Sequence, residues 1–263
     1  MPVDFERRGQ VALITLNRPE KLNALDGAMM RRLGEIWREF RDADDLRVAI
    51  VTGAGDRSFC SGRDLGAAAP GSPEYHRQAR EREEDEEAPG SGFTPTGIWK
   101  PIIAAINGHC LAGGFALALA CDLRIASENA MIGTSAAKRG LLAGGGQIQR
   151  LARYVPFGRA LEMLLFSDSI DARTAYEIGL VNRVVPLPDL LPTALSWAER
   201  LCENAPLALQ ATKEVAYRGV FDMTFEEAMR LEGRFYNRIL ETEDVLEGAR
   251  AFAERRKPEF KGR

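Results

Sequence analysis

The segment from Pro101 to Ser127, PIIAAINGHCLAGGFALALACDLRIAS, constrains the fold of this chain more than any other stretch. Its apolar run Ile102 to Ile106 predicts a buried strand, which the following Asn-Gly pair ends. After a second turn at Gly113 and Gly114, the small apolar series Phe115 to Ala120 predicts a buried helix. Paired glycines let a backbone approach a ligand closely, and a helix start leaves N–H groups without partners. The segment therefore predicts backbone N–H groups that hold negative charge on a ligand oxygen.

Further short apolar runs predict strands in the first two thirds of the chain, at Val11 to Leu16, Ala49 to Thr52 and Leu123 to Ala126. From Phe157 onward the pattern becomes mainly helical. Two caps are recognisable in this part. Asp171 is expected to cap a helix that ends near Gly179 and precedes the strand LVNRVV, and Thr224 with Glu227 predicts a capping box for a helix running toward Leu240.

Length and composition set the class of protein. With 263 residues and 45% apolar residues, the chain can form one large domain, alone or with an appendage. A net charge of −3 without a basic cluster gives no reason to expect nucleic acid or a membrane surface as partner. No run approaches ~20 apolar residues, so we expect a cytoplasmic protein. The four cysteines (Cys60, Cys110, Cys121, Cys202) have no CxxC spacing, which predicts buried free thiols and no metal site.

Other segments add a resemblance to a known family. They are LNRPEKLNAL (16–25), AIVTGAGDRSFCSGRDLG (49–66), SIDARTAYEIGLVNRVVP (169–186) and EDVLEGARAFAERRKPEFKGR (243–263). Together with the glycine segment, and in this order, they resemble the crotonase, or enoyl-CoA hydratase/isomerase, superfamily over essentially the whole chain. The resemblance implies an α/β fold, a crotonase-type spiral of ββα units with a helical C-terminal region. Residues 1–200 would form the core with the acyl-CoA site, and residues 201–263 a helical trimerisation region of a homotrimer or a dimer of trimers.

The resemblance also implies the site. In this family two backbone N–H groups bind the carbonyl oxygen of an acyl-CoA thioester, and the matching residues here are Arg63 and Gly113. Hydratases of the family carry two glutamates, whose positions correspond here to Ala116 and Ala136. A slot that some relatives fill with aspartate falls near Gly144 and is also empty. Because two methyl groups cannot manage a water molecule and a proton, ordinary hydration is disfavoured.

Contacts to CoA are implied at Arg18 and Lys21, at Asp64 and Leu65 after the first oxyanion residue, and at Lys261 near the terminus. CoA would enter as part of the substrate thioester, so no separate cofactor and no metal is expected. A nicotinamide cofactor is not indicated, because neither GAG at 53–55 nor GGGQ at 144–147 forms a G-x-G-x-x-G turn.

Several other side chains could replace the missing acids. His109 is the usual type of base at neutral pH, but its place before the glycine turn also fits a packed residue. Asp64 fits a helix cap. Lys138 and Arg139 lie where relatives line the acyl pocket, and fit either a substrate carboxylate or a solvated loop. The acidic stretch EREEDEE (81–87) lies in a segment (67–97) whose composition is typical of a solvated loop, although a lid carboxylate is an alternative.

Three functions follow. The first is an enzyme that forms a thioester enolate, by isomerisation, dehydration, C–C cleavage or decarboxylation. The second is a non-catalytic protein that binds or transfers acyl-CoA. The third, a purely structural oligomer, is disfavoured by the retained turn segments around Arg63 and Gly113. A family match indicates the scaffold more strongly than it indicates the reaction.

Overall fold

The structure, a computed structural model, describes residues 1–64 and 92–263. Its centre is a six-stranded sheet in the order β1-β2-β3-β5-β7-β10, in which β1 and β2 are antiparallel and the other neighbours are parallel. The strands are β1 (Val3–Arg8), β2 (Val11–Leu16), β3 (Val48–Gly53), β5 (Ile102–Ile106), β7 (Leu123–Ser127) and β10 (Arg183–Val185). The four strands predicted from apolar runs are thus confirmed as β2, β3, β5 and β7.

A smaller sheet lies beside the first, in the order β4-β6-β8-β9. It contains β4 (Ser58–Cys60), β6 (His109–Leu111), β8 (Met131–Gly133) and β9 (Ile170–Asp171). The chain passes repeatedly from the large sheet to the small one, from β3 to β4, from β5 to β6 and from β7 to β8. Helix α3 (Gly113–Ala120) follows β6. This arrangement confirms the predicted α/β spiral with ββα units.

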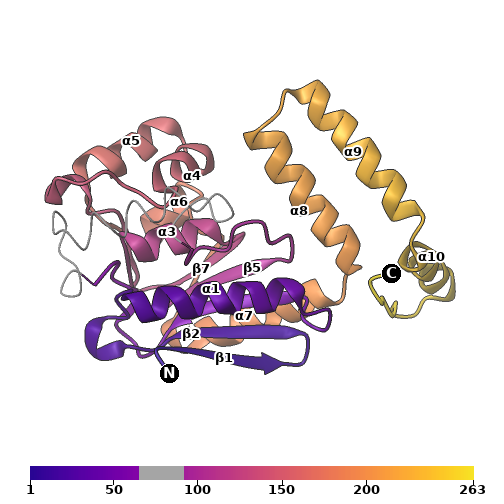
Figure 1. Cartoon of the computed structure of the whole chain (residues 1–263), viewed down its shortest axis with the longest axis horizontal. Helices are drawn as coiled ribbons and strands as arrows, with labels where there is room; N and C mark the ends of the chain where they lie inside the picture. The colour runs from indigo at the N-terminus through magenta and orange to yellow at the C-terminus, as the bar shows by residue number, and fades with distance from the viewer. Residues whose placement is uncertain (65–91) are drawn as a thin grey trace.

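The two faces of the large sheet are covered by different helices (Figure 1). Because successive side chains of a strand point to opposite faces, Val11 and Leu13 of β2 pack on one side and Ile14 on the other. The first side is covered by α7 (Leu187–Cys202) and the second by α1 (Gly27–Asp42). Both helices bury an apolar stripe, so the central strands are covered on both faces, whereas the edge strand β1 stays partly exposed.

Short helices lie between the strands: the 3-10 turn Pro19–Lys21 follows β2, and the 3-10 turn Ala137–Arg139 follows β8. Helices α4 (Gln147–Tyr154) and α5 (Phe157–Phe166) come before β9, and α6 (Ala172–Glu177) comes directly after it. Asp171 caps α6, since its Oδ1 accepts a 2.7 Å hydrogen bond from the Thr174 N–H, as predicted. The strand expected from Leu180 is shorter than predicted. The N–H groups of Leu180 and Val181 donate to the Ala175 carbonyl at the end of α6 and are not available to the sheet.

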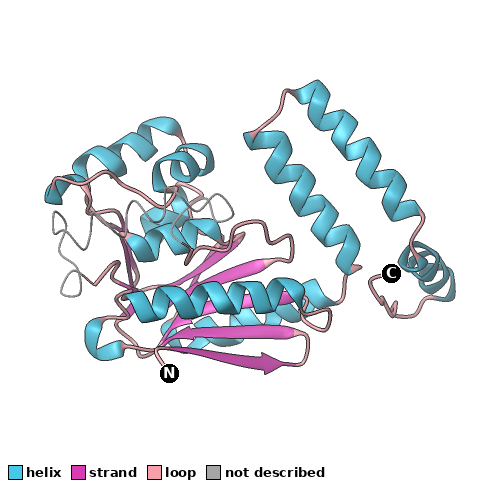
Figure 2. Ribbon diagram, viewed as in Figure 1, coloured by secondary structure: helices cyan, strands magenta, loops and turns pink. Residues whose placement is uncertain are grey.

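Helices α8 (Pro206–Phe221), α9 (Phe225–Leu240) and α10 (Glu243–Glu254) project away from the sheets (Figure 2). Thr224 and Glu227 form the predicted capping box at the start of α9. The division predicted at residue 200 falls in the last turn of α7. Arg47 ties this region to the core by donating to the carbonyls of Cys202 and Phe260. Within the described ranges, none of the helices is long and apolar enough to cross a membrane.

Candidate active site

The first predicted oxyanion donor, Arg63, lies just after β4. Leu25 and Arg63 form an isolated parallel bridge, in which the Leu25 N–H donates to the Gly62 carbonyl at 2.8 Å and the Asp64 N–H donates to the Leu25 carbonyl at 2.9 Å. In this parallel pairing Leu25 bonds to the residues on either side of Arg63, and Arg63 itself bonds to neither group of Leu25. The Arg63 N–H therefore points away from Leu25.

The second predicted donor, Gly113, is the first residue of α3. The first N–H groups of a helix have no acceptor inside that helix, and the first bond that closes the turn here runs from the Ala116 N–H to the Ala112 carbonyl. Ala112, the N-cap, has φ 48° and ψ −114°, a conformation that residues with a side chain rarely adopt. This unusual backbone sets the direction in which α3 begins.

The two amides are close neighbours. A Cβ atom added to Gly113 would lie 3.5 Å from the Arg63 nitrogen, and a Cβ atom added to Gly62 would lie 3.3 Å from the Gly113 nitrogen. Gly62 also has φ +105° and would place its Cβ atom 2.8 Å from the Cβ atom of Ala112. Only glycine fits this turn without displacement. Arg63 and Gly113 lie far apart in the sequence, and the structure brings their backbone amides close together.

The two positions of the missing glutamates differ in their surroundings. Ala116 is buried in the first turns of α3, with 1% of its surface exposed. A Cβ atom added to Gly145 would lie 2.9 Å from the Ala116 Cβ atom, so the loop 144–146 packs directly on this methyl group. Ala136 is half-buried before the 3-10 turn, and its N–H donates to Thr134 Oγ1 at 3.3 Å. Glycine at position 145 thus permits a close approach of the loop to Ala116 that a residue with a side chain would not.

The described side chains that could replace the missing acids are either exposed or held in ion pairs. His109 is exposed at the start of β6. Lys138 forms an ion pair with Asp168, and Arg139 is exposed beside it. Asp64 accepts from Arg18 at 3.1 Å. The acidic stretch 81–87 and Leu65 lie outside the described residues.

The cations predicted to contact CoA lie in two parts of the chain: Arg18 and Lys21 lie at the first 3-10 turn, and Lys261 belongs to the C-terminal tail. Arg18 is held between Asp26 at 3.0 Å and Asp64 at 3.1 Å and also donates to the Ala24 carbonyl, so its charge is compensated locally. Lys21 is exposed on the first 3-10 turn. Lys261 is exposed in the C-terminal tail, where its backbone N–H donates to Asp244 Oδ1 at 2.7 Å. Their role toward CoA stays a prediction.

The four cysteines are not suited to act as nucleophiles. All four cysteines are free thiols, as predicted. Cys60, Cys110 and Cys121 are buried, also as predicted, whereas Cys202 is only half-buried. Burial raises the pKa of Cys60 and that of Cys121 to about 12. These thiols stay protonated near neutral pH and act as packing groups behind α3.

Sequence reasoning missed two features of the site. The left-handed backbone of Ala112 has no local signal, because alanine gives no indication of positive φ. The approach of Gly145 to Ala116 depends on two segments that only the tertiary fold brings together, although the glycine run at 144–146 is the one visible sign of a close approach.

Comparison with known proteins places these features in a family. Residues 6–263 match the family described as enoyl-CoA hydratase/isomerase. Across its full length the chain is 43% identical to the whole of an (E)-benzylidenesuccinyl-CoA hydratase from Thauera aromatica. It is also 40% identical to a carnitinyl-CoA dehydratase from Proteus mirabilis, over 97% of each chain.

Solved structures agree. The fold matches an enoyl-CoA hydratase from Bacillus anthracis with a TM-score of 0.92 and 34% identity over 100% of both chains. A probable enoyl-CoA hydratase/isomerase from Mycobacterium abscessus matches with a TM-score of 0.88 and 39% identity, over 99% of this chain and 98% of that one. The protein is therefore a crotonase-fold protein, and it belongs to the enoyl-CoA hydratase/isomerase family.

Proposed function

We propose that this protein binds acyl-CoA thioesters and stabilises an enolate-like oxygen with the N–H groups of Arg63 and Gly113. The observation that carries the proposal is the closeness of these amides at the start of α3: a Cβ atom added to Gly113 would lie 3.5 Å from the Arg63 nitrogen, and one added to Gly62 would lie 3.3 Å from the Gly113 nitrogen. Fixed dipoles favour an oxygen on which charge develops, most of all where little water enters. The positive end of the α3 dipole acts in the same direction. The relatives named (E)-benzylidenesuccinyl-CoA hydratase and carnitinyl-CoA dehydratase act on CoA thioesters by their names, which supports this ligand class.

Standard hydration is disfavoured in this proposal by Ala116 and Ala136. Adding water to an enoyl double bond requires one group to take a proton from water and another to deliver a proton to carbon. Positioned acid–base groups contribute about 100- to 10,000-fold each. The close approach of Gly145 to Ala116 supports this inference, because the loop that lies against the methyl group carries no acidic side chain at positions 144–146.

Enolate-forming reactions that need few protein acids fit these residues best. In a decarboxylation, the bond between the α-carbon and the carboxylate breaks, and carbon dioxide leaves. The electron pair stays on the α-carbon and is delocalised onto the thioester oxygen, where the two N–H groups receive it. A solvent proton then completes the product. Isomerisation and C–C cleavage remain within the proposal, since they pass through the same oxygen charge. Dehydration is disfavoured together with hydration, because it is the same reaction in reverse and needs the same acid and base.

A non-catalytic protein that binds or transfers acyl-CoA is the second candidate. The observation that favours it is the combination of a retained pair of backbone donors with alanine at both acid positions. Such a protein would hold a thioester without converting it.

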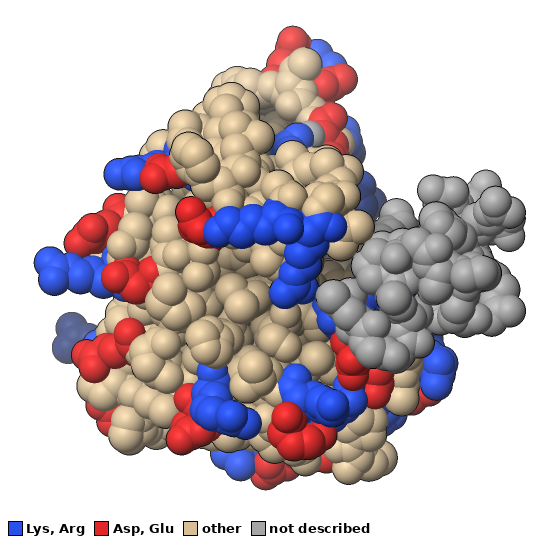
Figure 3. All heavy atoms as spheres, turned by 90° about the vertical axis from the view of Figure 1, so that its left-hand side faces the viewer, with Lys and Arg blue, Asp and Glu red and all other residues tan. Residues whose placement is uncertain are grey.

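Assembly as a homotrimer or a dimer of trimers belongs to the same proposal, as does a cytoplasmic location. Helix α9 exposes Phe225 and Tyr236, which are 82% and 64% accessible. At the other end of the molecule, α5 exposes Phe157 and Leu165. Figure 3 shows a broad uncharged area on that face, with charged side chains more numerous toward its edge. Apolar areas at two ends support head-to-tail contacts between copies, and analytical ultracentrifugation measures the state directly.

The test is incubation of the purified protein with crotonyl-CoA in heavy water, followed by mass spectrometry. Deuterium uptake or double-bond migration without addition of water is the expected result for an enolate-forming enzyme. Unchanged crotonyl-CoA that stays bound through gel filtration would favour the binding protein. Rapid gain of the mass of water would refute the role given to Ala116 and Ala136, and absence of binding would refute the oxyanion site.

A further inference from the structure

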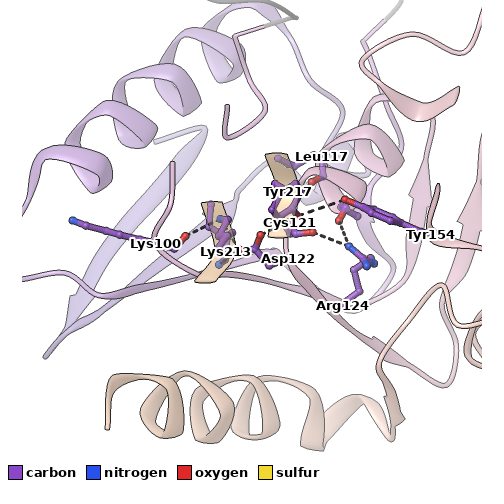
Figure 4. A network of polar contacts seen from close by, with 10 residues as sticks. Lys100, Leu117, Cys121, Asp122, Arg124, Tyr154, Lys213 and Tyr217 are labelled. Atoms are coloured by element: carbon purple, nitrogen blue, oxygen red, sulfur yellow. Dashed lines mark hydrogen bonds and ion pairs between the residues drawn. The ribbon is translucent and has the colours of Figure 1, made fainter. Parts of the chain in front are cut away.

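A cluster of polar side chains lies at the ends of α3 and α4 that are remote from the candidate site (Figure 4). Helix α3 begins with Gly113 at the oxyanion hole, and α4 begins directly after the loop that packs on Ala116. Both helices have eight residues and span roughly 12 Å. The two helices thus start at the site and end at the polar cluster, which consists of Asp122, Arg124, Tyr154, Lys213 and Tyr217.

Arg124 joins the ends of the two helices. Its side chain is buried, with 7% of the residue exposed. Nη1 donates to the carbonyls of Cys121 at 2.7 Å and Ala118 at 3.4 Å, in the last turn of α3. The guanidinium lies 4.9 Å from the ring centre of Tyr154, the last residue of α4. A cation at this place satisfies the last carbonyls of α3 and offsets the negative end of its dipole.

Tyr217 of α8 reaches the same two helix ends. Its hydroxyl donates to Asp122 Oδ1 at 3.0 Å, and Asp122 comes directly after Cys121, the C-cap of α3. The same hydroxyl lies 3.5 Å from that of Tyr154, at the outer limit of a hydrogen bond. Burial and the neighbouring carboxylate of Asp122 hold the pKa of Tyr217 above its usual value, so the phenol keeps its proton and remains a donor.

Asp122 is itself fixed by further bonds. Its Oδ2 accepts from Lys213 Nζ at 2.7 Å and from the Ile102 N–H at the start of β5, also at 2.7 Å. The side chains of Lys213 and Asp122 are only 13% and 15% exposed. A charge pair that is largely buried and fully hydrogen-bonded holds its geometry more firmly than a surface pair. The C-terminal end of α3 is therefore anchored both to the sheet and to α8.

The placement of α3 matters because the two oxyanion donors belong to different segments. Arg63 is held by Leu25, whereas Gly113 moves with α3. A short helix behaves as a rigid body, so a displacement of its last turn also moves its first residue. The contact of Gly145 with Ala116 couples α4 to the same position.

We propose that Arg124 and Tyr217 are positioning residues for the oxyanion hole: they fix the remote ends of α3 and α4 and thereby the position of the Gly113 N–H relative to the Arg63 N–H. Tyr217 belongs to the helical C-terminal region, which gives that region a direct part in the geometry of the site. The inference rests on the proposed function, because it concerns the same two donors.

The test uses butyryl-CoA labelled with carbon-13 at the carbonyl, bound to the full-length protein. Hydrogen bonds from the two N–H groups lower the carbonyl stretching frequency, which difference infrared spectroscopy measures. Tyr217→Phe removes one hydroxyl and keeps the ring. Tyr176→Phe, at a 56% exposed position on α6, is the matched control. We expect a full downshift in the wild type and the control, and a smaller downshift with weaker binding in Tyr217→Phe.

The possible results separate the two proposals. A full downshift in Tyr217→Phe would overturn the positioning role, even if the unfolding temperature fell, because a merely structural residue lowers stability without moving the carbonyl band. Absence of a downshift in the wild type would instead refute the oxyanion hole itself. Arg124→Lys serves as the second variant, since it keeps the charge but loses the fork that reaches several carbonyls. It is expected to reduce the downshift further, and should it fail to fold, Tyr217→Phe decides alone.

Discussion

Replacing Gly62 with alanine would place one methyl group beside both donors of the proposed oxyanion hole. Gly62 has φ +105°, and the new Cβ atom would lie 2.8 Å from the Ala112 Cβ atom and 3.3 Å from the Gly113 nitrogen. The added atom meets fixed backbone and a side chain that has no freedom to turn away. The turn must therefore move, and the Arg63 and Gly113 N–H groups must move with it.

The magnitude has two parts. A residue with a side chain held at such a φ costs about 1–3 kcal/mol. Overpacking a closed site costs a further ~1–3 kcal/mol. Gly179→Ala isolates the first part, because Gly179 has φ +77° and nothing lies within 4 Å of an added Cβ atom. Gly62→Ala is thus expected to lower the free energy of unfolding by roughly 2–6 kcal/mol, and Gly179→Ala by only about 1–3 kcal/mol.

Urea unfolding measures stability, and binding of carbon-13 butyryl-CoA with its carbonyl band measures the site. Gly179→Ala should bind normally, whereas Gly62→Ala should lose both affinity and the downshift. The double variant Gly62→Ala/Ala112→Gly removes the colliding methyl group and should recover part of the stability, with a coupling of about 0.5–3 kcal/mol. If Gly62→Ala lowers the free energy of unfolding no more than Gly179→Ala does and binds the thioester unchanged, the two turns do not approach each other as closely as described.

Three further predictions concern other parts of the chain. Ala116→Glu should destabilise the protein by about 3 kcal/mol or more, because it buries a carboxylate against packed backbone. Ala136→Glu, at a half-buried position, should change the free energy of urea unfolding little. Equal stability of the two variants would contradict the close packing at Ala116. In the native protein at pH 8, iodoacetamide should label Cys202 first, and mass spectrometry should find the three buried thiols modified only after unfolding. Arg256 holds the pKa of Glu247 down to about 2. Because this folded-state pKa lies below the ordinary value of 4.5, the pair stabilises the fold above pH 4.5, and this stabilisation is lost as the pH falls toward 2. Arg256→Met should raise the Glu247 titration midpoint in NMR, and an unchanged midpoint would exclude the pair as its cause.

Much of the local structure follows from the sequence because its signals are local. The apolar run Ile102 to Ile106 forms β5, and the small apolar series after Gly113 and Gly114 forms α3, since burial and helix propensity act within a few residues. Asp171 and Thr224 cap the helices that they were expected to cap, because a capping bond spans only three residues.

The environment of the predicted site residues could not be derived in this way. Arg18 was predicted to approach CoA, yet Asp64, far along the chain, comes within 3.1 Å and compensates its charge. Asp64 fitted a helix cap in the sequence, and in the structure its carboxylate binds Arg18. Charges that neutralise each other across distant segments leave no pattern within either segment.

By itself, the sequence predicted four central strands, the helix after Gly113 and two helix caps, and it determined that positions 116 and 136 carry no acid. The tertiary structure decided how the two backbone donors face each other, how the loop at Gly145 closes on Ala116, and how Arg124 and Tyr217 hold the remote helix ends. The physical reason is range. Propensity, caps and apolar periodicity act between near neighbours in the chain, whereas the distance between two amides depends on how separate segments pack against one another.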